Sequence, residues 1–346
     1  MDNKVHTFSL KIDWDLIDLI SQIDRFDASW STIEKKEGQS LKQLKSFATI
    51  RSVGASTRIE GSKLSDKEVE VLLNNLDVRK IRDRDTQEVI GYFETLDLIT
   101  ESYFDIDITE NSIKSLHNLL LKYSEKDIWH KGDYKQHSNA VEATLPDGSK
   151  QIVFETAEPG FPTQDAMRQL VTWYKKDAKV HPLVKCALFT YEFLSIHPFQ
   201  DGNGRLSRLI STLLLLKNDY KWIQYVSFEH EIESRKVEYY RRLRSCQSQR
   251  PHEDVSAWVY FFFDALCSIQ KQLMMKLAVK GVEAKLTPKE KSVLVFIENN
   301  PGCKSGEIAD KLGIPVPTVK KLLPGLLVKN LIEKHGSGPG TNYAIK

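Results

Sequence analysis

The feature that most constrains this chain is a glycine-rich turn between two apolar helical stretches. Residues 183–196 and 206–217 are rich in leucine and other apolar residues, and their length and pattern favour buried helices. Between them, residues 197–208 read His-Pro-Phe-Gln-Asp-Gly-Asn-Gly-Arg-Leu-Ser-Arg. Pro198 ends the first helix, the two glycines permit positive φ, and the second helix begins near Arg205. The pattern predicts a mainly helical domain with an ordered turn between two buried helices.

Apolar residues recur at helical spacing through most of the rest of the chain. A hairpin is the exception: β-prone residues in the stretch 141–154 flank Asp147-Gly148, which is a turn signal. A lone hairpin is poorly stable, so it must pack on the helices. Ser65 is a candidate N-cap for the helix that follows it. Further helices are predicted at residues 15–23, 66–76, 108–120, 163–174 and 255–279, the last either continuous or broken near its middle.

Residues 286–346 form a separate unit with three predicted helices and two short strands. Thr287 caps the first helix and Pro288 takes its first position. The order of elements resembles a winged helix-turn-helix, with Pro324 expected to shorten or kink the third helix. The unit carries nine Lys, five Asp or Glu and no Arg, a balance of +4. The sequence favours neither DNA binding nor protein docking over the other as the function of this unit. The predicted domains are thus 1–110, 111–280 and 286–346.

Composition excludes several classes of protein. The 346 residues are 41% hydrophobic and 28% charged, which is typical of a soluble globular protein rather than a disordered one. We expect no transmembrane helix, because no apolar run approaches about 18 residues, and no secretory signal peptide. Four scattered cysteines favour free thiols in a reducing cytoplasm over disulfides or a zinc site. The net charge of +2 does not by itself indicate a nucleic-acid binder.

The turn at residues 197–208 holds the parts needed to transfer a phosphorus group. Backbone amides of a glycine-rich turn that leads into a helix bind anions, and Arg205 and Arg208, three residues apart, can clamp phosphate oxygens. Asp201 offers the oxygen ligand that Mg²⁺ prefers. His197 can accept a proton from a hydroxyl near neutral pH. The alternative is a plain turn with His197 packed in the core, but the combination favours a Mg-nucleotide transferase.

The stretch resembles the signature of the Fic family, His-Pro-Phe-x-Asp/Glu-Gly-Asn-Gly-Arg-x-x-Arg, at every defined position, and the likeness extends over residues 50–270. This resemblance implies a helical core with a β-hairpin flap and the transfer of AMP from ATP to a protein hydroxyl, with release of pyrophosphate. It implies that His197 deprotonates the hydroxyl and that Asp201 holds Mg²⁺. Gly at position 204 favours nucleotidyl transfer, because kinases of this superfamily carry Lys there. The implied nucleotide contacts are Gly202, Asn203, Gly204, Arg205, Arg208 and, for adenine, Tyr240, with Asn203 and Arg205 counted as catalytic.

A second stretch, Ser56-Thr57-Arg58-Ile59-Glu60-Gly61, resembles the inhibitory pattern Ser/Thr-x-x-x-Glu-Gly/Asn of the same family. The resemblance implies an inhibitory helix at about residues 52–62, with Ser56, Glu60 and Gly61 as its marked positions. Glu60 would pair with Arg208 and fill the space of the γ-phosphate. The alternative is that Glu60 caps a helix or makes a surface ion pair. The resemblance also implies that the flap pairs with the backbone of the target protein.

Three functions therefore compete. The first is protein adenylylation restrained by Glu60, and the second is removal of AMP from a modified protein at the same site. The third is a DNA-binding regulator whose Fic-like core senses a nucleotide. The expected partners are ATP, a target protein or the chain itself, a second copy in a homodimer, and DNA at the C-terminal unit. No membrane is expected among them.

Overall fold

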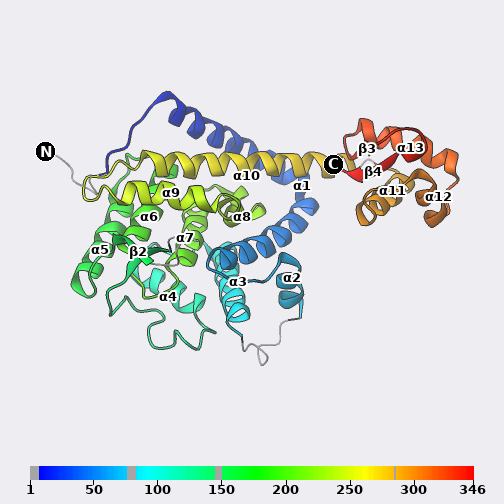
Figure 1. The fold of residues 1–346 in the computed structure, drawn as a ribbon. Coiled ribbons are helices and arrows are strands. Elements are labelled where there is room, and N and C mark those ends of the chain that lie inside the picture. Colours follow the sequence, from blue (N-terminus) through cyan, green and yellow to red (C-terminus); the bar gives the residue numbers. More distant parts are fainter. Residues whose placement is uncertain (1–7, 76–82, 145–149, 284–285) are drawn as a thin grey trace. The chain divides into compact units, whose positions relative to one another are not determined.

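The computed structural model describes residues 8–75, 83–144, 150–283 and 286–346. It divides into two compact units, residues 1–271 and residues 272–346. Both are built mainly from helices (Figure 1). The prediction of a mainly helical chain is therefore confirmed. No helix in the described ranges combines the length and apolar character needed to cross a bilayer.

The first unit begins with one helix of 46 residues, α1 (Trp14–Ile59). It starts at Asp13, whose side chain accepts a hydrogen bond from the amide of Leu16. The helix packs against α3 (Arg84–Ser102), η2 (Lys221–Tyr225) and α8 (Phe228–Ser234). It contains the predicted helix at 15–23. Of the inhibitory helix expected at about 52–62, residues 52–59 are the C-terminal end of this same helix, and Glu60 is its C-cap.

Local capping signals set several helix starts. The side chain of Ser65 and that of Glu68 form a capping box at α2 (Asp66–Asn74), as predicted for Ser65. Thr109 caps α4 (Glu110–Leu120) by accepting from the amide of Ser112. Such caps satisfy amides that have no partner within the helix.

The core is centred on α6 (Pro182–Ile196) and α7 (Asn203–Lys217), which pack on each other. Nearly all of their side chains are buried, as expected of helices that are hydrophobic all round. α5 (Phe161–Lys176) packs on α6, while α3 packs on α7. α9 (Lys236–Gln247) and α10 (Ser256–Glu283) also contact α6, because Gln247 Nε2 donates to the Ser195 hydroxyl and Trp258 Nε1 donates to the Ala187 carbonyl. α10 is one continuous helix, not two.

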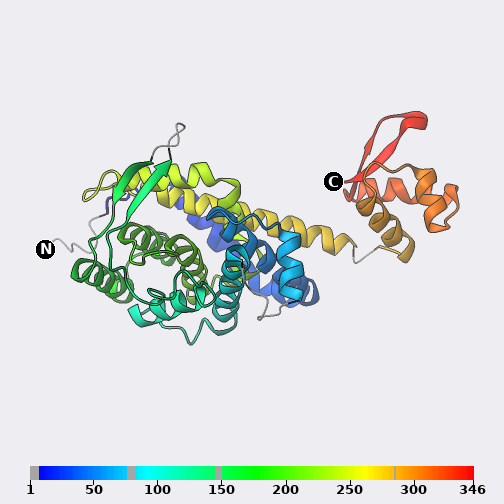
Figure 2. The ribbon, with the colours of Figure 1, turned by 60° about the horizontal axis from the view of Figure 1, so that its bottom comes forward.

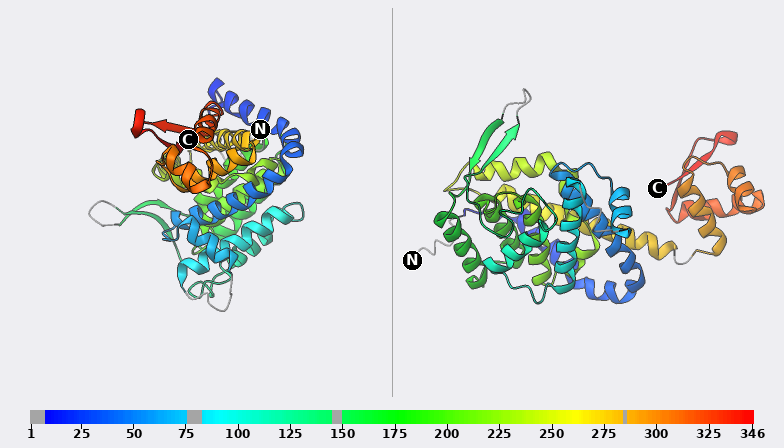
Figure 3. Two further views of the ribbon diagram at one scale, coloured as in Figure 1. Left: turned by 90° about the vertical axis from the view of Figure 1, so that its right-hand side faces the viewer. Right: turned by 90° about the horizontal axis from the view of Figure 1, so that it is seen from below.

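The predicted hairpin is present as β1 (Ala140–Thr144) and β2 (Lys150–Glu155), which pair in antiparallel fashion. A bulge interrupts the register between Val141 and Glu142. The hairpin projects from the helical body of the first unit (Figures 2 and 3). Its predicted Asp147-Gly148 turn lies outside the described residues. We refer to β1 and β2 as the flap.

The second unit contains α11 (Pro288–Asn299), α12 (Ser305–Leu312) and α13 (Val316–Val328), followed by β3 (Ile332–His335), η3 (Gly338–Gly340) and β4 (Asn342–Ile345). This is the predicted winged helix. Thr287 caps α11 with Pro288 at its first position, as expected. Pro324 lies within α13 yet does not shorten it, because the helix continues to Val328. A small apolar core joins the elements: Val293, Ile297, Ile308, Val319, Leu323 and Leu326.

Candidate active site

The turn between α6 and α7 is closed by its own side chains. α6 ends at Ile196, and His197 follows in the left-handed region with φ 52°. Asn203 closes the loop, because its Oδ1 accepts from the amide of Phe199 at 3.0 Å and its Nδ2 donates to the Phe199 carbonyl at 2.7 Å. Asn203 therefore shapes the turn with its side chain, which leaves its backbone amide for a ligand. The helix begins at Asn203, earlier than the expected start near Arg205.

The N-terminus of α7 is available to an anion. Gly202 precedes it with φ 81°, a conformation that favours glycine, and no side chain in the described part of the chain caps the first amides of the helix. Uncapped amides and the helix dipole together attract negative charge. The helix start at Gly202 to Gly204 therefore suits an anion, and its use as a phosphate cradle stays a prediction.

The side chain of Arg208, on α7, is bonded to residues at the C-terminal end of α1. Its guanidinium donates from Nε to the Ser56 hydroxyl at 2.8 Å and from Nη2 to the Ser56 carbonyl at 3.0 Å. Nη2 also donates to Glu60 Oε1 at 2.8 Å. Arg208 is 2% exposed and Glu60 is 29% exposed at the side chain. Burial alone would raise the pKa of Glu60, but the Arg208 and Arg205 cations hold it below its usual value. The contact is thus an ion pair, as the inhibitory pattern implies, and Glu60 also ends α1 as its C-cap.

Two glycines have separate reasons to be glycine. Gly61 follows Glu60 with φ 107°, which side chains rarely adopt. Of the two glycines in the turn only Gly202 has a positive φ. Gly204 is helical, but a Cβ there would overlap the Glu60 carboxylate. Gly204 is therefore required for space as long as Glu60 occupies this position.

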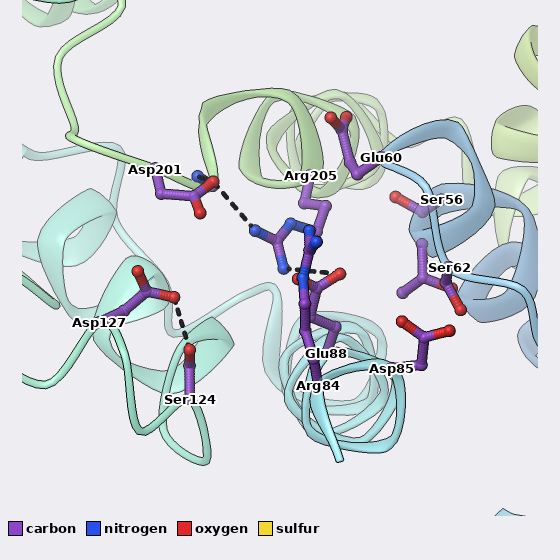
Figure 4. Close-up of polar contacts among 12 residues, drawn as sticks. Ser56, Glu60, Ser62, Arg84, Asp85, Glu88, Ser124, Asp127, Asp201 and Arg205 are labelled. Carbon is purple, nitrogen blue, oxygen red and sulfur yellow. Dashed lines mark hydrogen bonds and ion pairs between the residues drawn. The ribbon is translucent and has the colours of Figure 1, made fainter.

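Arg205 lies between two carboxylates of different elements. Its Nη2 is 3.2 Å from Asp201 Oδ1, and its Nη1 is 3.4 Å from Oε2 of Glu88 on α3. Glu88 in turn pairs with Arg84 at 2.7 Å. Figure 4 shows Arg205 between Asp201 and Glu88, with Glu60 and Ser56 on the opposite side. Arg205 Nε is buried and has no hydrogen-bond partner among the described residues, so it can still donate a hydrogen bond to a phosphate oxygen.

Asp201 is ionised in this setting. Although burial opposes it, the Arg205 and Lys126 cations hold the pKa of Asp201 far below its usual range. Lys126 Nζ is 2.8 Å from Asp201 Oδ2, and the carboxylate is 38% exposed. An ionised, accessible carboxylate beside a phosphate cradle fits Mg²⁺, which is bound by one or two carboxylates together with substrate phosphates. The donor set at Asp201 therefore suits the predicted metal.

His197 reaches the same cavity as Glu60 and Arg208. Burial, together with the nearby Lys135 cation, lowers the pKa of His197 to about 4, so its imidazole is neutral at pH 7 and can accept a proton. The cavity has a volume of about 230 Å³. Tyr240 and the buried Tyr239 contribute rings to it. The other lining residues are Leu194, Gly204, Leu243, Arg244 and Gln247.

His117 lies on α4 and supports the turn between α6 and α7. The sequence analysis assigned it no role. His117 is fully buried and stacks on Phe199 with 3.8 Å between ring centroids. Its Nε2 lies 3.0 Å from the Asp201 carbonyl, while its Nδ1 accepts from the amide of Gly132 at 2.9 Å. His117 is therefore structural, and the structure that it supports is the Asp201 turn.

Three further residues at the site were not predicted: Glu88, Lys126 and Lys135. Glu88 and Lys126 lie outside the motifs of the sequence analysis, because each reaches the turn from a distant segment. For Glu88, a charged residue among buried neighbours of α3 was the available signal. Lys135 ends the stretch Gly132-Asp133-Tyr134-Lys135, which resembles the family segment that leads into the flap. Lys126 carried no such signal.

Comparison with known proteins agrees with this geometry. Residues 107–215 match the model of the Fic/DOC family, and residues 284–340 match that of the MarR family. The chain therefore contains a Fic/DOC domain followed by a MarR-family winged helix. Among curated relatives, the protein adenylyltransferase Fic of Drosophila melanogaster and that of Drosophila sechellia are each 26% identical over 207 residues. The match covers 58% of this chain and 39% of each relative, so it spans only about two fifths of their length.

Solved structures share the fold. A Fic family protein from Desulfovibrio desulfuricans G20 superposes with a TM-score of 0.65 at 24% identity, covering 97% of each chain. A Fic domain containing signaling protein from Bacteroides thetaiotaomicron gives a TM-score of 0.59 at 22% identity, over 74% of this chain and 96% of that one. The predicted Fic-type core with a winged helix is confirmed at the level of the fold.

Proposed function

We propose that this chain transfers AMP from Mg-ATP to a side-chain hydroxyl of a target protein or of itself, and that Glu60 restrains the transfer. One observation carries the proposal: a single cavity joins His197, the N-terminus of α7 and Arg208, with Glu60 bonded to Arg208 inside it. The Fic/DOC match and the adenylyltransferase relatives support the reaction class.

In this proposal the uncapped amides of α7 bind the α-phosphate. Arg205 and Arg208 bind the β- and γ-phosphates, and Tyr240 packs against adenine. The target hydroxyl oxygen forms a bond to the α-phosphorus while the bond from that phosphorus to the bridging oxygen breaks. The hydroxyl proton passes to the neutral imidazole of His197, and pyrophosphate leaves. Preorganised donors around the phosphates stabilise the charge that develops in this step.

Asp201 would hold Mg²⁺, which neutralises phosphate charge when bound. Lys126 pairs with one oxygen of this carboxylate, and a carboxylate has lone pairs for both a lysine and a metal. Glu60 restrains the reaction because Arg208 cannot bond fully to its carboxylate and to a γ-phosphate at once.

The test is the Glu60→Gly variant, incubated with ATP labelled at the α-phosphate. A hydrogen bond to a charged group is worth about 1.5–3 kcal/mol, so we expect transfer of label to protein to rise roughly ten- to a hundredfold. The double variant that adds His197→Ala serves as the control and should transfer none. Mass spectrometry should show one adenylyl group per modified hydroxyl. Equal labelling of the wild type and Glu60→Gly would remove Glu60 from the inhibitory role.

Removal of AMP is the second candidate, favoured by the Glu60 carboxylate facing the same cavity as His197. There Glu60 would accept a proton from the attacking water. Incubating the wild type and Glu60→Gly with an adenylylated protein separates the two reactions. If AMP removal dominates, the wild type releases AMP from the adenylylated protein and Glu60→Gly does not. If adenylylation dominates, Glu60→Gly instead gains label in the assay with α-labelled ATP.

DNA binding is a third candidate, supported by the MarR-family match and by exposed Lys320 and Lys321 on α13. The absence of Arg in residues 286–346 argues against strong readout of guanine. A gel-shift assay on the full chain at rising salt checks this, because phosphate contacts make the affinity fall steeply with salt. His197→Ala should leave such binding intact.

We also propose a homodimer and a cytoplasmic location. All four cysteines are free and buried, as in proteins of reducing compartments. Sedimentation of the full chain measures the oligomeric state directly.

A further inference from the structure

Lys135 is a buried cation beside the active site that the Fic signature does not contain. It is 2% exposed, and buried lysines are rare unless polar groups satisfy them. Its Nζ donates to Asn139 Oδ1 at 2.8 Å, to Thr156 Oγ1 at 2.6 Å and to the Ile196 carbonyl at 3.3 Å. All three ammonium hydrogens therefore have an acceptor.

Two of these acceptors form the base of the flap. Asn139 directly precedes β1 and Thr156 directly follows β2. The Thr156 hydroxyl lies 2.6 Å from the Asn139 carbonyl, and Asn139 Nδ2 donates to the Phe199 carbonyl at 2.9 Å. The base of the flap is thus bonded to the turn that carries the catalytic residues, with Lys135 at the centre.

Lys135 also contacts the backbone on each side of His197. Its Nζ donates to the carbonyl of residue 196, and its backbone amide donates to the Pro198 carbonyl at 2.8 Å. His197 itself has φ 52°, which costs a non-glycine residue of order 1 kcal/mol or more and persists only where the surroundings enforce it. The two bonds from Lys135 are well placed to enforce it.

We propose that Lys135 is a positioning residue that fixes the His197 imidazole relative to the base of the flap. The inference rests on the proposed function, in which His197 takes the proton from the target hydroxyl, and on the expectation from the family resemblance that the flap pairs with the target backbone. One ammonium group then sets the distance between the strand that holds the target and the base that activates it.

The charge of Lys135 also affects the pKa of His197, which gives a second way to test the positioning role. Burial lowers the pKa of Lys135 to about 8, so it is mainly charged at pH 7. Its positive charge adds to burial in lowering the pKa of His197, whereas the Glu60 and Asp201 carboxylates oppose it. Removing the Lys135 charge should therefore raise the pKa of His197, an effect that a residue with a purely structural role would not have.

The experiment compares Lys135→Met with Lys135→Arg in the Glu60→Gly background. The pKa of His197 is read from NMR titration of ¹³C-labelled histidine, assigned with His197→Ala. We expect Lys135→Met to raise that pKa, to move the acidic limb of AMP transfer to higher pH and to lower kcat roughly ten- to a hundredfold, the cost of a misplaced catalytic group. The KM for ATP should stay unchanged, because Lys135 does not line the nucleotide cavity. Lys135→Arg keeps the charge and should keep the wild-type pKa.

Thr156→Val provides a second variant if Lys135→Met fails to fold, which thermal unfolding will reveal. It removes one flap contact but leaves the cation, so kcat should fall while the pKa of His197 stays nearly constant. An unchanged His197 pKa and kcat in Lys135→Met, or an unchanged kcat in Thr156→Val, would overturn the inference. If Glu60→Gly itself transfers no AMP, the proposed function fails separately, and the NMR titration still decides whether Lys135 acts on His197.

Discussion

The ion pairs that fasten the end of α1 lead to a prediction about how Glu60 is kept in place. Arg58, two residues before Glu60, donates from Nε and Nη2 to the two oxygens of Glu233 on α8, at 2.7 and 3.0 Å. Arg58 also pairs with Asp66 at 2.9 Å. Lys236 donates to the carbonyl of Ile59 at 2.6 Å. These contacts lie outside the cavity, yet they hold the turn that presents Glu60 to Arg208.

Glu233→Gln weakens the bidentate pair without touching the cavity. Hydrogen bonds between charged groups are worth about 1.5–3 kcal/mol when buried; Arg58 and Glu233 are 21% and 24% exposed at their side chains, so we take about 1–2 kcal/mol. If the interaction of Arg58 with Glu233 favours the state in which Glu60 is bonded to Arg208, its loss shifts the equilibrium. The population of molecules in which Glu60 has left Arg208 then rises by roughly 5- to 30-fold. AMP transfer should rise by the same factor, up to the rate of Glu60→Gly.

The assay is labelling from α-labelled ATP in four proteins: wild type, Glu233→Gln, Glu60→Gly and the double variant. Glu238→Gln is the matched control, because Glu238 pairs with Arg235 and Arg242 instead of with α1. We expect activation by Glu233→Gln only when Glu60 is present. Equal activation in the Glu60→Gly background, or in Glu238→Gln, would refute the reasoning, since the effect would then not pass through Glu60.

Two further predictions concern glycine and histidine at the turn. Gly204→Ala places a Cβ on the Glu60 carboxylate and should displace it, so labelling from α-labelled ATP rises in the wild-type background but not in Glu60→Gly; a fall in both would mean that the added methyl obstructs ATP instead. Burial lowers the pKa of His117 to about 4 in the folded chain, from the ordinary histidine pKa of 6.5. Between about pH 4 and pH 6.5, His117 is therefore protonated more often in the unfolded chain than in the folded one. The free energy of unfolding should therefore fall as the pH drops through that window, by up to about 3 kcal/mol from this residue. His117→Gln should lose less stability than the wild type between pH 7 and pH 4.5 in urea titrations, and parallel losses would contradict the linkage.

Local signals in the sequence predicted much of the fold. Ser65 and Thr287 form the capping boxes of α2 and α11, and each depends only on residues within one helical turn. The winged helix followed from such signals as well. The length of α1 did not, because residues between its two ends are largely polar and the helix is stabilised by packing on distant segments.

The site divides in the same way. His197, Asp201 and Arg208 lie in one short motif from which the chemistry could be predicted. The structure brings His197 and Arg208 into one cavity with Glu60, which pairs with Arg208 as the resemblance implied. His117, Glu88 and Lys135 contribute only through tertiary contacts. The spacing of residues along the chain contains no information about those contacts, so sequence reasoning could not place them.

The close approach of Gly204 and Glu60 restricts how this protein can diverge. As long as the acidic side chain lies over the first turn of α7, no residue larger than glycine fits beneath it. Losing the carboxylate lifts that restriction, and the vacated space then admits a bulkier side chain at position 204. A larger residue at position 204 and the contact between Glu60 and Arg208 therefore exclude each other, so a change in nucleotide chemistry at this position also removes the restraint by Glu60.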